Sequence, residues 1–481
     1  MSIAGTDIGR RSIVGLIVVL TAMLAVSSCG RPDRTQPETA DRPRPDVLFI
    51  LVDALRRDHV GLYGATASAT PFLDELGARG TVFDDALSQA PQTLNSTASL
   101  FTSRAFPWLL RGVEHDPIPG VAPERRDQWA RTPRLAAANL TVTEVLRDAG
   151  YQTVALFNNP HHHATSGFWQ GFDEARLLPR DPDQAYARAD SVRQAFLDWH
   201  AGRDPERPYF AYLHFMEPHN PYRPPDAYRK LFPPGPGRYS YTNGRPEPGF
   251  SAADLATMKA LYNGEIRFLD DQLRELVGEL ERRDGLGTTL IVVTADHGEE
   301  LMDHGGLGHG KTVELEQLRI PLLVAGGPVA PAAGRRIGSL VRNLDLAPTL
   351  VDLAGIDPPA SFEGTSLLPL LSDPPVAPAP AAVSFAWIAR LRSLTSAEWH
   401  CMRDLDRDLP VLYHRSVDPT GATDVAVDHP DLVELCLSTL DRLEQQHDES
   451  IARARELKAI EAGGAPDEGV REQLEALGYV E

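Results

Sequence analysis

The sequence predicts an α/β fold in which a doubly wound, mostly parallel sheet is covered by helices. Two observations predict this fold. Nearly continuous apolar runs of strand length recur along the chain, and segments with apolar residues at helical spacing separate them. A strand buried on both faces of a parallel sheet has such a continuous run, whereas the helices that cover the sheet show the helical spacing.

The predicted strands and helices of the large domain alternate along the chain. The apolar runs that predict strands are Val47–Asp53, Tyr209–Phe215, Thr289–Gly310 at its outer limit, and Ile320–Gly326. The segments with helical spacing are Thr70–Arg79, Thr143–Gly150 and Ala252–Arg283. This alternation favours a parallel sheet with helical crossovers.

A proline- and alanine-rich break at Ser372–Ala382 divides the chain into a large domain, residues 46–371, and a smaller one, residues 383–446. The smaller domain contains the strand patterns SFAWIARLRSL, EWHCMRDL and PVLYHRSVDPTG, with a turn at Asp418–Gly421. Because a helical pattern follows at Asp431–Gln445, we predict a small α+β domain. The charged residues 447–481 are predicted to be a helical tail.

The N-terminus predicts export. Arg10 and Arg11 precede the apolar run Ile13–Val26, which is followed by small residues and Cys29. This run is shorter than the ~20 residues that span a membrane, and its flanks are those of a secretory signal. Residues 1–28 resemble a bacterial lipoprotein signal peptide, which implies that Cys29 carries lipid. An uncleaved N-terminal anchor is the alternative.

The expected location is therefore the bacterial cell envelope, in the periplasm or at the outer membrane. The proline- and charge-rich residues 29–45 predict an extended tether. In an oxidising compartment Cys401 and Cys436 could pair, although the sequence alone leaves their pairing open.

The net charge of −20 argues against a nucleic-acid or anionic-membrane surface, since either would need a basic face. If the substrate is anionic, local positive charge must overcome this field, and a bound metal ion can supply it. The oligomeric state is left open.

Two predicted strands end on acidic side chains. Asp53 ends one run, and Asp296 with His297 ends another. In open parallel sheets, ligands bind beyond the carboxyl ends of the strands. Asp53 alone could cap a helix, but a carboxylate beside an imidazole at a second strand end is typical of a metal site.

Several segments occur in an order that resembles the sulfatase family of the alkaline phosphatase superfamily. They are DVLFILVDALRRDHVGLYG, TPFLDELGARGTVFDDALSQAP, FMEPHNPYRPP, ADHGEELMDHGGLGHG and LRIPLLV. The resemblance runs from Asp46 to about Leu371, with a fainter likeness to the family's C-terminal domain in VLYHRSVDPTGATDVAVDHPDLVELC and EALGYV. It implies an alkaline-phosphatase-like catalytic domain that hydrolyses esters.

The stretch SQAPQTLNSTASLFTS, Ser88 to Ser103, departs from the family pattern. True sulfatases carry a C/S-x-P-x-R signature whose first residue becomes formylglycine. Thr93, Asn95 and Thr97 occupy the corresponding positions here, and threonine cannot yield the aldehyde. Threonine resembles instead the phosphodiesterase, pyrophosphatase and lipoteichoic-acid-synthase-like members, in which its hydroxyl is the nucleophile. The alternative for Thr93 is a helix cap.

The resemblance also implies a metal site formed by Asp53, Asp296 and His297, with Thr93 as a further ligand. A metal would activate the weakly nucleophilic hydroxyl, and the helix start behind it would offer N–H groups to phosphoryl oxygens. Sulfatases commonly have two adjacent aspartates where this chain has Asp53 and Ala54, which favours manganese or zinc, with calcium or magnesium possible. The segment EPHNPYR lacks the ligands of a second zinc, so one ion is expected.

Four further side chains are candidates for the site. His214 and His219 lie at and after a strand end, and His309 and Lys311 resemble leaving-group and anion-binding positions. A histidine is the natural acid for a departing alkoxide near neutral pH. His214 could equally be a core histidine, and Lys311 an ordinary surface lysine. The run His161–His163 predicts a loop near the mouth of the site.

The expected function is that of an exported, metal-dependent hydrolase or transferase of phosphoester or phosphodiester bonds. One alternative is a sulfate-ester hydrolase that uses unmodified threonine. Another is a catalytically silent binding lipoprotein. The charged groups retained at the strand ends argue against a protein without catalytic activity.

Overall fold

The computed structural model describes most of the chain from Arg44 onward. The described residues are 44–65, 69–105, 109–110, 133–181, 186–239, 244–327, 334–371, 384–388, 390–407 and 409–456. The predicted signal peptide with Cys29, nearly all of the predicted tether and residues 457–481 of the predicted tail lie outside them. None of the described helices is both long and apolar enough to cross a membrane.

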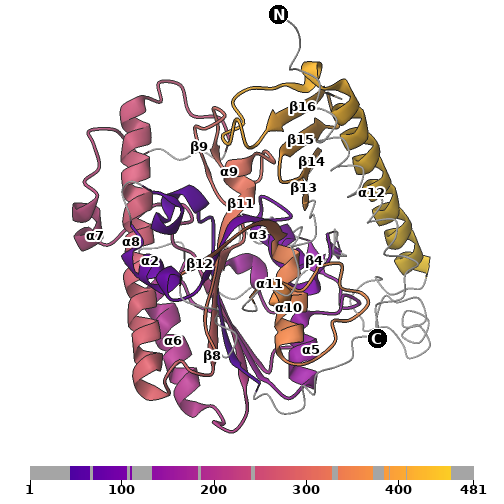
Figure 1. Ribbon diagram of the computed structural model, residues 1–481. Helices are drawn as coiled ribbons and strands as arrows, with labels where there is room; N and C mark the ends of the chain where they lie inside the picture. The colour runs from indigo at the N-terminus through magenta and orange to yellow at the C-terminus, as the bar shows by residue number, and fades with distance from the viewer. Residues whose placement is uncertain are drawn as a thin grey trace, which may run out of the picture.

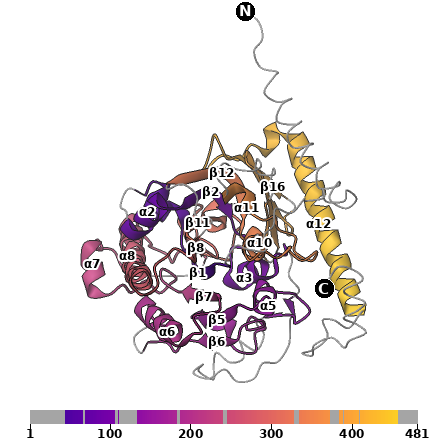
Figure 2. The same cartoon turned by 60° about the horizontal axis from the view of Figure 1, so that its bottom comes forward.

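An eight-stranded sheet in the order β12-β2-β11-β8-β1-β7-β5-β6 forms the centre of the molecule (Figures 1 and 2). Its strands are β1 (Asp46–Val52), β2 (Thr81–Leu87), β5 (Gln152–Phe157), β6 (Glu174–Leu177), β7 (Tyr209–Phe215), β8 (Thr289–Ala295), β11 (Arg319–Gly326) and β12 (Arg335–Arg342). All neighbours pair in parallel except β11, which is antiparallel to both β2 and β8. The predicted mostly parallel, helix-covered sheet is confirmed.

Helices cover both faces of the sheet (Figure 2). One face carries α2 (Pro71–Ala78), α6 (Ala189–Gly202) and α8 (Ala252–Arg283), with α7 (Asp226–Leu231) packed on α8. The other carries α3 (Thr93–Thr102), α5 (Val142–Asp148) and α10 (Leu346–Leu353). The remaining short helices are α9 (Leu315–Leu318) and α11 (Leu368–Leu371).

The helix boundaries have local causes. Helix α8 begins with a capping box, because the Ser251 side chain accepts from the Asp254 N–H while Asp254 bonds back to the Ser251 N–H. Thr141 and Glu144 form the same arrangement at the start of α5. Apolar side chains at helical spacing then hold α8 on the sheet, among them the buried Leu269.

The register of the central strands places the acidic strand ends next to each other. Strands β1 and β8 are parallel with Val52 opposite Ala295, so Asp53 and Asp296 follow at neighbouring positions. On the other side of β1, His214 on β7 lies opposite Leu51. A short hairpin, β9 (Glu300–Leu301) with β10 (Leu307–Gly308), then turns the chain back toward this edge. A further strand pair is β3 (Leu109–Leu110) with β4 (Arg134–Leu135).

The C-terminal domain is a four-stranded antiparallel sheet with one long helix beside it (Figure 1). It contains β13 (Ser384–Ile388), β14 (Leu391–Thr395), β15 (Trp399–Asp404), β16 (Leu409–His414) and α12 (Pro430–Glu456). Met402 and Tyr413 pack against Leu87 and Leu340 of the large domain. A disulfide between Cys401 and Cys436 joins β15 to α12, which answers the question of pairing that the sequence left open. Helix α12 continues across the boundary expected between residues 446 and 447.

Candidate active site

Four of the sequence-predicted residues converge at the carboxyl ends of β1 and β8. Asp53, Asp296 and His297 are fully buried, and Thr93 is 5% exposed. The Thr93 Oγ1 lies 3.3 Å from His297 Nε2 and 3.4 Å from Asp53 Oδ2. His297 Nε2 lies 3.7 Å from Asp53 Oδ1 and 3.5 Å from Asp296 Oδ2.

Thr93 is the first residue of α3 and does not cap it. The N-cap position belongs to Gln92, whose side chain makes no capping hydrogen bond. The capping alternative for Thr93 is therefore wrong, because its hydroxyl faces Asp53 and His297 instead of the helix backbone. The first N–H groups of α3 are left without a side-chain cap, which suits an anion at this helix start.

Hydrogen bonds behind the site hold Thr93 and its helix in place. The Ser96 hydroxyl donates to the backbone carbonyl of Asp296 over 2.6 Å and ties α3 to the end of β8. The Thr97 hydroxyl donates to the Thr93 carbonyl over 2.6 Å and contacts His162 Nε2 at 2.9 Å. Ser96 and Thr97 thus position the helix and do not face the pocket.

The backbone fixes the orientation of Asp296 and His297. Asp296 Oδ1 accepts from the N–H of Ala54 over 3.1 Å and from the N–H of His297 over 2.8 Å. Ala54 adopts a left-handed backbone conformation with φ 56°, which costs a non-glycine residue about 1 kcal/mol or more. His297 Nδ1 lies 2.8 Å from the Gly298 carbonyl, so Nδ1 carries the proton and Nε2 is free to act as a ligand.

The donor atoms fit a metal ion. Asp53 Oδ1 and Asp296 Oδ2 are buried and receive no hydrogen bond from any described residue, yet both face His297 Nε2. Ligands at about 2.1 Å from one ion lie roughly 3.0–3.5 Å from each other, close to the spacings observed here. Because unpaired buried carboxylate oxygens are costly, a divalent cation among these atoms is the arrangement that satisfies them.

Besides Thr93, the other oxygen of Asp53, Oδ2, has two further partners. His214 Nε2 lies 3.1 Å from it, and the side-chain amide of Asn159 donates to it over 2.9 Å. Asn159 also reaches Thr93 Oγ1 at 3.4 Å. His214 is fully buried, and its ring nitrogen lies within 4.8 Å of ligand oxygens of both Asp53 and Asp296. It can therefore orient the Asp53 carboxylate or join the two aspartates in holding a metal ion.

Two further predicted histidines border the site on the other side. The rings of His219 and His309 are 5.0 Å apart, and those of His309 and His297 are 4.4 Å apart. His219 Nδ1 lies 2.7 Å from the Asn220 carbonyl. His309 Nδ1 lies 3.0 Å from Glu299 Oε1, and Glu299 Oε2 accepts from the Tyr222 hydroxyl over 3.1 Å. Both histidines therefore keep Nε2 for chemistry.

The burial of the site shifts the pKa of its groups in opposite directions. Burial lowers the pKa of His297 to about 3, with the charge of His309 adding to the effect, so its ring is the neutral, ligating form. Burial raises the pKa of Asp296 well above its usual value, and Asp53 raises it further. Burial would lower the pKa of His309, but the Glu299 carboxylate outweighs it and raises the pKa, favouring the proton-donating form.

Lys311 lies at the margin of the site. Lys311 is exposed, and its positive charge lowers the pKa of the His309 ring. The histidine run, predicted to be a loop near the mouth of the site, instead contains a short 3-10 helix (Pro160–His162), and His162 and His163 are buried. His162 is a core residue that stacks on Phe157. The charges of Asp53, His219 and His309 act on His161, although burial is the largest cause that lowers its pKa to about 4.

Asn159 and Glu299 were missed by sequence reasoning. Asn159 follows β5, a strand that was not predicted, so its place at a strand end went unnoticed. Glu299 lies two residues after His297 in the segment ADHGEE, and a carboxylate so close to two histidines was a usable signal.

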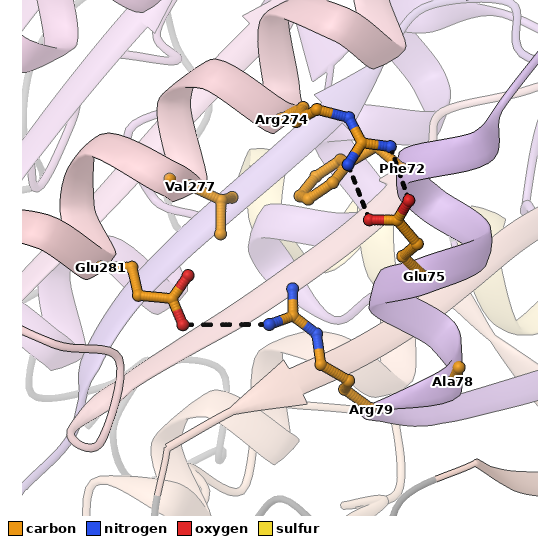
Figure 3. A pocket seen from close by; sticks show the side chains of 8 residues that line it. Phe72, Glu75, Ala78, Arg79, Arg274, Val277 and Glu281 are labelled. Atoms are coloured by element: carbon orange, nitrogen blue, oxygen red, sulfur yellow. Dashed lines mark hydrogen bonds and ion pairs between the residues drawn. The ribbon is translucent and has the colours of Figure 1, made fainter.

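A shallow depression lies elsewhere, between α2 and α8 (Figure 3). The ion pairs Arg274–Glu75 and Arg79–Glu281 cross it, and Phe72 and Val277 form its floor. None of its lining residues belongs to the site at the strand ends.

Comparison with known proteins identifies the family and agrees with the fold. The sulfatase family model matches residues 45–356. The chain is 23% identical over 382 residues to an arylsulfatase of Clostridium perfringens, which covers 69% of this chain and 79% of the arylsulfatase. It is 25% identical over 410 residues to a multifunctional alkaline phosphatase superfamily protein of Trinickia caryophylli, which covers 69% of this chain and 77% of that protein.

Solved structures share the fold. A phosphonate monoester hydrolase of Agrobacterium radiobacter superposes with a TM-score of 0.67 at 21% identity, covering 84% of this chain and 96% of that chain. A protein solved in complex with its substrate D-glucosamine-2-N,6-O-disulfate superposes with a TM-score of 0.68 at 18% identity. The superposition covers 85% of this chain and 99% of that chain. With the family match over 45–356, the chain belongs to the sulfatase family of the alkaline phosphatase superfamily and is a hydrolase of that family.

Proposed function

We propose that this protein is a metal-dependent hydrolase, or transferase, of phosphoester or phosphodiester bonds and that Thr93 is its nucleophile. The observation that carries the proposal is the position of Thr93 Oγ1, buried at the start of α3 and 3.3–3.4 Å from His297 Nε2 and Asp53 Oδ2. The formylglycine signature of true sulfatases is absent at Thr93, Asn95 and Thr97, which supports the unmodified threonine hydroxyl as the attacking group.

We also propose that one divalent ion binds between Asp53, Asp296, His297 and Thr93, with manganese or zinc favoured and calcium or magnesium as further candidates. The unsatisfied oxygens of the two aspartates support this site. When bound, such an ion lowers the pKa of the Thr93 hydroxyl and neutralises charge on the phosphoryl group.

The other residues then have distinct tasks in the reaction. Asp53 Oδ2, 3.4 Å away, accepts from the Thr93 hydroxyl and orients it. Thr93 Oγ1 attacks phosphorus and its proton passes to Asp296, whose side chain also contacts Thr93 and whose pKa is raised by burial, which gives a phosphothreonine. The first N–H groups of α3 hold the phosphoryl oxygens. His309, oriented by Glu299, gives a proton to the departing alkoxide.

Water, or an alcohol in the case of transfer, then attacks the phosphorus of the phosphothreonine and gives its proton to His309, which is neutral after the first step. The bond between phosphorus and Thr93 Oγ1 breaks, the phosphate or new phosphoester leaves, and Asp296 returns the proton to the Thr93 oxygen.

Sulfate-ester hydrolysis by the same residues is the second candidate function. It is favoured by the arylsulfatases among the relatives and would also use an unmodified threonine. The two ester classes place similar tetrahedral anions in the site, so substrate assays must separate them.

The assay compares aryl phosphate, phosphodiester and sulfate ester side by side, with each metal added to chelator-treated protein. Thr93→Ala should lower turnover by several orders of magnitude, while Thr93→Ser retains more because the same oxygen remains. His309→Ala should lose more on alkyl than on nitrophenyl leaving groups, since only the alkoxide needs the proton. Near-normal turnover of Thr93→Ala in a correctly folded protein would refute the nucleophile.

We propose further that the protein is exported and held in the bacterial cell envelope through lipid on Cys29. The signal-like run before Cys29 supports this, and the Cys401–Cys436 disulfide is of the kind that persists in oxidising compartments. Cys29→Ser should therefore shift the protein out of the membrane fraction or stall its processing. Unchanged attachment and size would indicate an uncleaved anchor.

A further inference from the structure

A second group of potential metal ligands lies apart from the active site, where the C-terminal domain meets the large domain. His304 lies in the turn between β9 and β10, Glu314 comes immediately before α9, and Glu316 lies within it. The ligand atoms of these three residues lie within 4.8 Å of one another. The carbonyl of Gly421, from the turn after β16, reaches the same place.

The two ring nitrogens of His304 have different partners. Nδ1 lies 3.0 Å from Glu316 Oε1, whereas Nε2 lies 3.1 Å from the Gly421 carbonyl oxygen and 3.7 Å from Glu314 Oε2. A histidine that binds a metal almost always donates its other N–H to a carboxylate, as Nδ1 does here. The atoms around Nε2 have roughly the 3.0–3.5 Å spacing of ligands that share one ion.

Glu314 supplies an independent observation. The residue is only 8% exposed and its side chain is hydrogen-bonded to Tyr413, but its Oε2 receives no hydrogen bond from the described part of the chain. That oxygen faces His304 Nε2. Leaving a buried carboxylate oxygen without a donor is costly, so this oxygen needs a cation beside it. A protonated His304 or a divalent ion can fill that place, and measurements of metal content separate the two.

The charge of the cluster points the same way. Glu300, Glu314 and Glu316 face one histidine, and Glu300 Oε1 already accepts the N–H groups of His304 and Gly306. A divalent ion neutralises such a group of buried carboxylates better than one imidazolium does.

We propose that His304 Nε2, Glu314 Oε2 and the Gly421 carbonyl form a second divalent-metal site, with Glu316 orienting the histidine. One nitrogen with oxygen donors suits Zn²⁺ or a similar first-row ion better than Ca²⁺ or Mg²⁺. Gly421 has φ 67°, and a Cβ there would lie 2.8 Å from the Tyr413 ring, so the carbonyl is held in one orientation. Since Gly421 belongs to the C-terminal domain, the ion connects that domain to the large one.

Elemental analysis of the full-length chain purified with Zn²⁺ tests the proposal. The wild type should contain about two ions per chain, Asp296→Asn and His304→Gln about one each, and the double variant about none. Glu314→Gln should behave like His304→Gln while preserving the side-chain shape. His414→Gln, a partly buried histidine on β16 outside the cluster, is the matched control and should retain both ions. Equal metal content in His304→Gln, Glu314→Gln and wild type would overturn the second site.

The metal contents of the same variants also distinguish a failure of this second site from a failure of the proposed active-site metal. If the active-site assignment fails, Asp296→Asn keeps the wild-type content and only the His304 and Glu314 variants lose zinc. A thermal melt gives a second readout, because Zn²⁺ should raise the Tm of Asp296→Asn but not that of the Asp296→Asn, His304→Gln double variant. No zinc-dependent rise in either would mean that a protonated His304 alone occupies the cluster, and would also overturn the site.

Discussion

Asn159 contacts both the proposed nucleophile and a proposed metal ligand. Its amide donates to Asp53 Oδ2 over 2.9 Å and lies 3.4 Å from Thr93 Oγ1, while its own oxygen accepts the His161 N–H. Asn159 thus fixes which oxygen of Asp53 remains available to a metal. Residues that orient metal ligands in this way matter nearly as much as the ligands themselves.

We predict that Asn159→Ala lowers kcat/KM by roughly 10- to 100-fold and weakens metal binding. Asn159→Asp should lower kcat/KM and metal binding further, because it retains the size of the side chain but replaces the amide donor with a carboxylate that faces Asp53. Metal titration and steady-state rates of the two variants, with a thermal melt of each, provide the test. If Asn159→Asp were as active as wild type, the amide would have no positioning role.

The sequence was sufficient for the residues that belong to the strand-end motifs and insufficient for their partners. Asp53, Asp296 and His297 stand directly after predicted strands, so their convergence followed from parallel pairing. Whether His214 faces the core or the site depends on the register of β7 with β1, which the sequence does not contain. Asn159 depends on the path of the loop after β5.

At the scale of elements, the strands that were predicted are those buried on both faces. β7 has the predicted bounds Tyr209–Phe215, and α8 has the predicted bounds Ala252–Arg283. β2 was missed because the two aspartates in TVFDDAL interrupt the continuous apolar run from which the other strands were predicted. Asp85 in that strand is paired with Arg415 of the C-terminal domain at 2.6 Å, a tertiary contact that a local pattern cannot reveal. β12 was missed because its pattern of buried and exposed residues is that of a charged strand at the sheet edge.

The disulfide between β15 and α12 allows a prediction about the C-terminal domain. Cys401 and Cys436 are separated by 35 residues, and both are packed with Leu412 and Leu440. Closing a loop of this length stabilises a domain by roughly 2–4 kcal/mol. The Cys401→Ser, Cys436→Ser double variant should therefore unfold at lower temperature and lower urea concentration than the oxidised wild type.

Alkylation under denaturing conditions checks that the bond exists before the stabilities are compared. Two alkylatable thiols at these positions in protein purified without a reductant would contradict the crosslink. Reduced wild type is the matched control, since it should resemble the double variant and not the oxidised protein.

At the scale of the whole molecule, the charge of −20 opposes the approach of an anionic ester. The buried site adds carboxylates of its own, so attraction must arise within a short distance of the proposed metal ion, His309 and the exposed Lys311. Salt screens charges that lie more than about 10 Å apart at 0.1 M ionic strength, whereas contacts inside the site are screened much less. Added salt should therefore weaken the long-range repulsion more than the short-range attraction.

We predict that kcat/KM for a dianionic aryl phosphate rises by about two- to five-fold between low salt and physiological ionic strength. A monoanionic phosphodiester, measured in the same buffers as the control, should show a smaller rise because it carries less charge. The value of kcat should change little for either substrate, since salt acts here on the encounter and not on the bound complex. A fall of kcat/KM with salt would show that the positive groups near the site govern the approach, and that the acidic surface is too distant to oppose it.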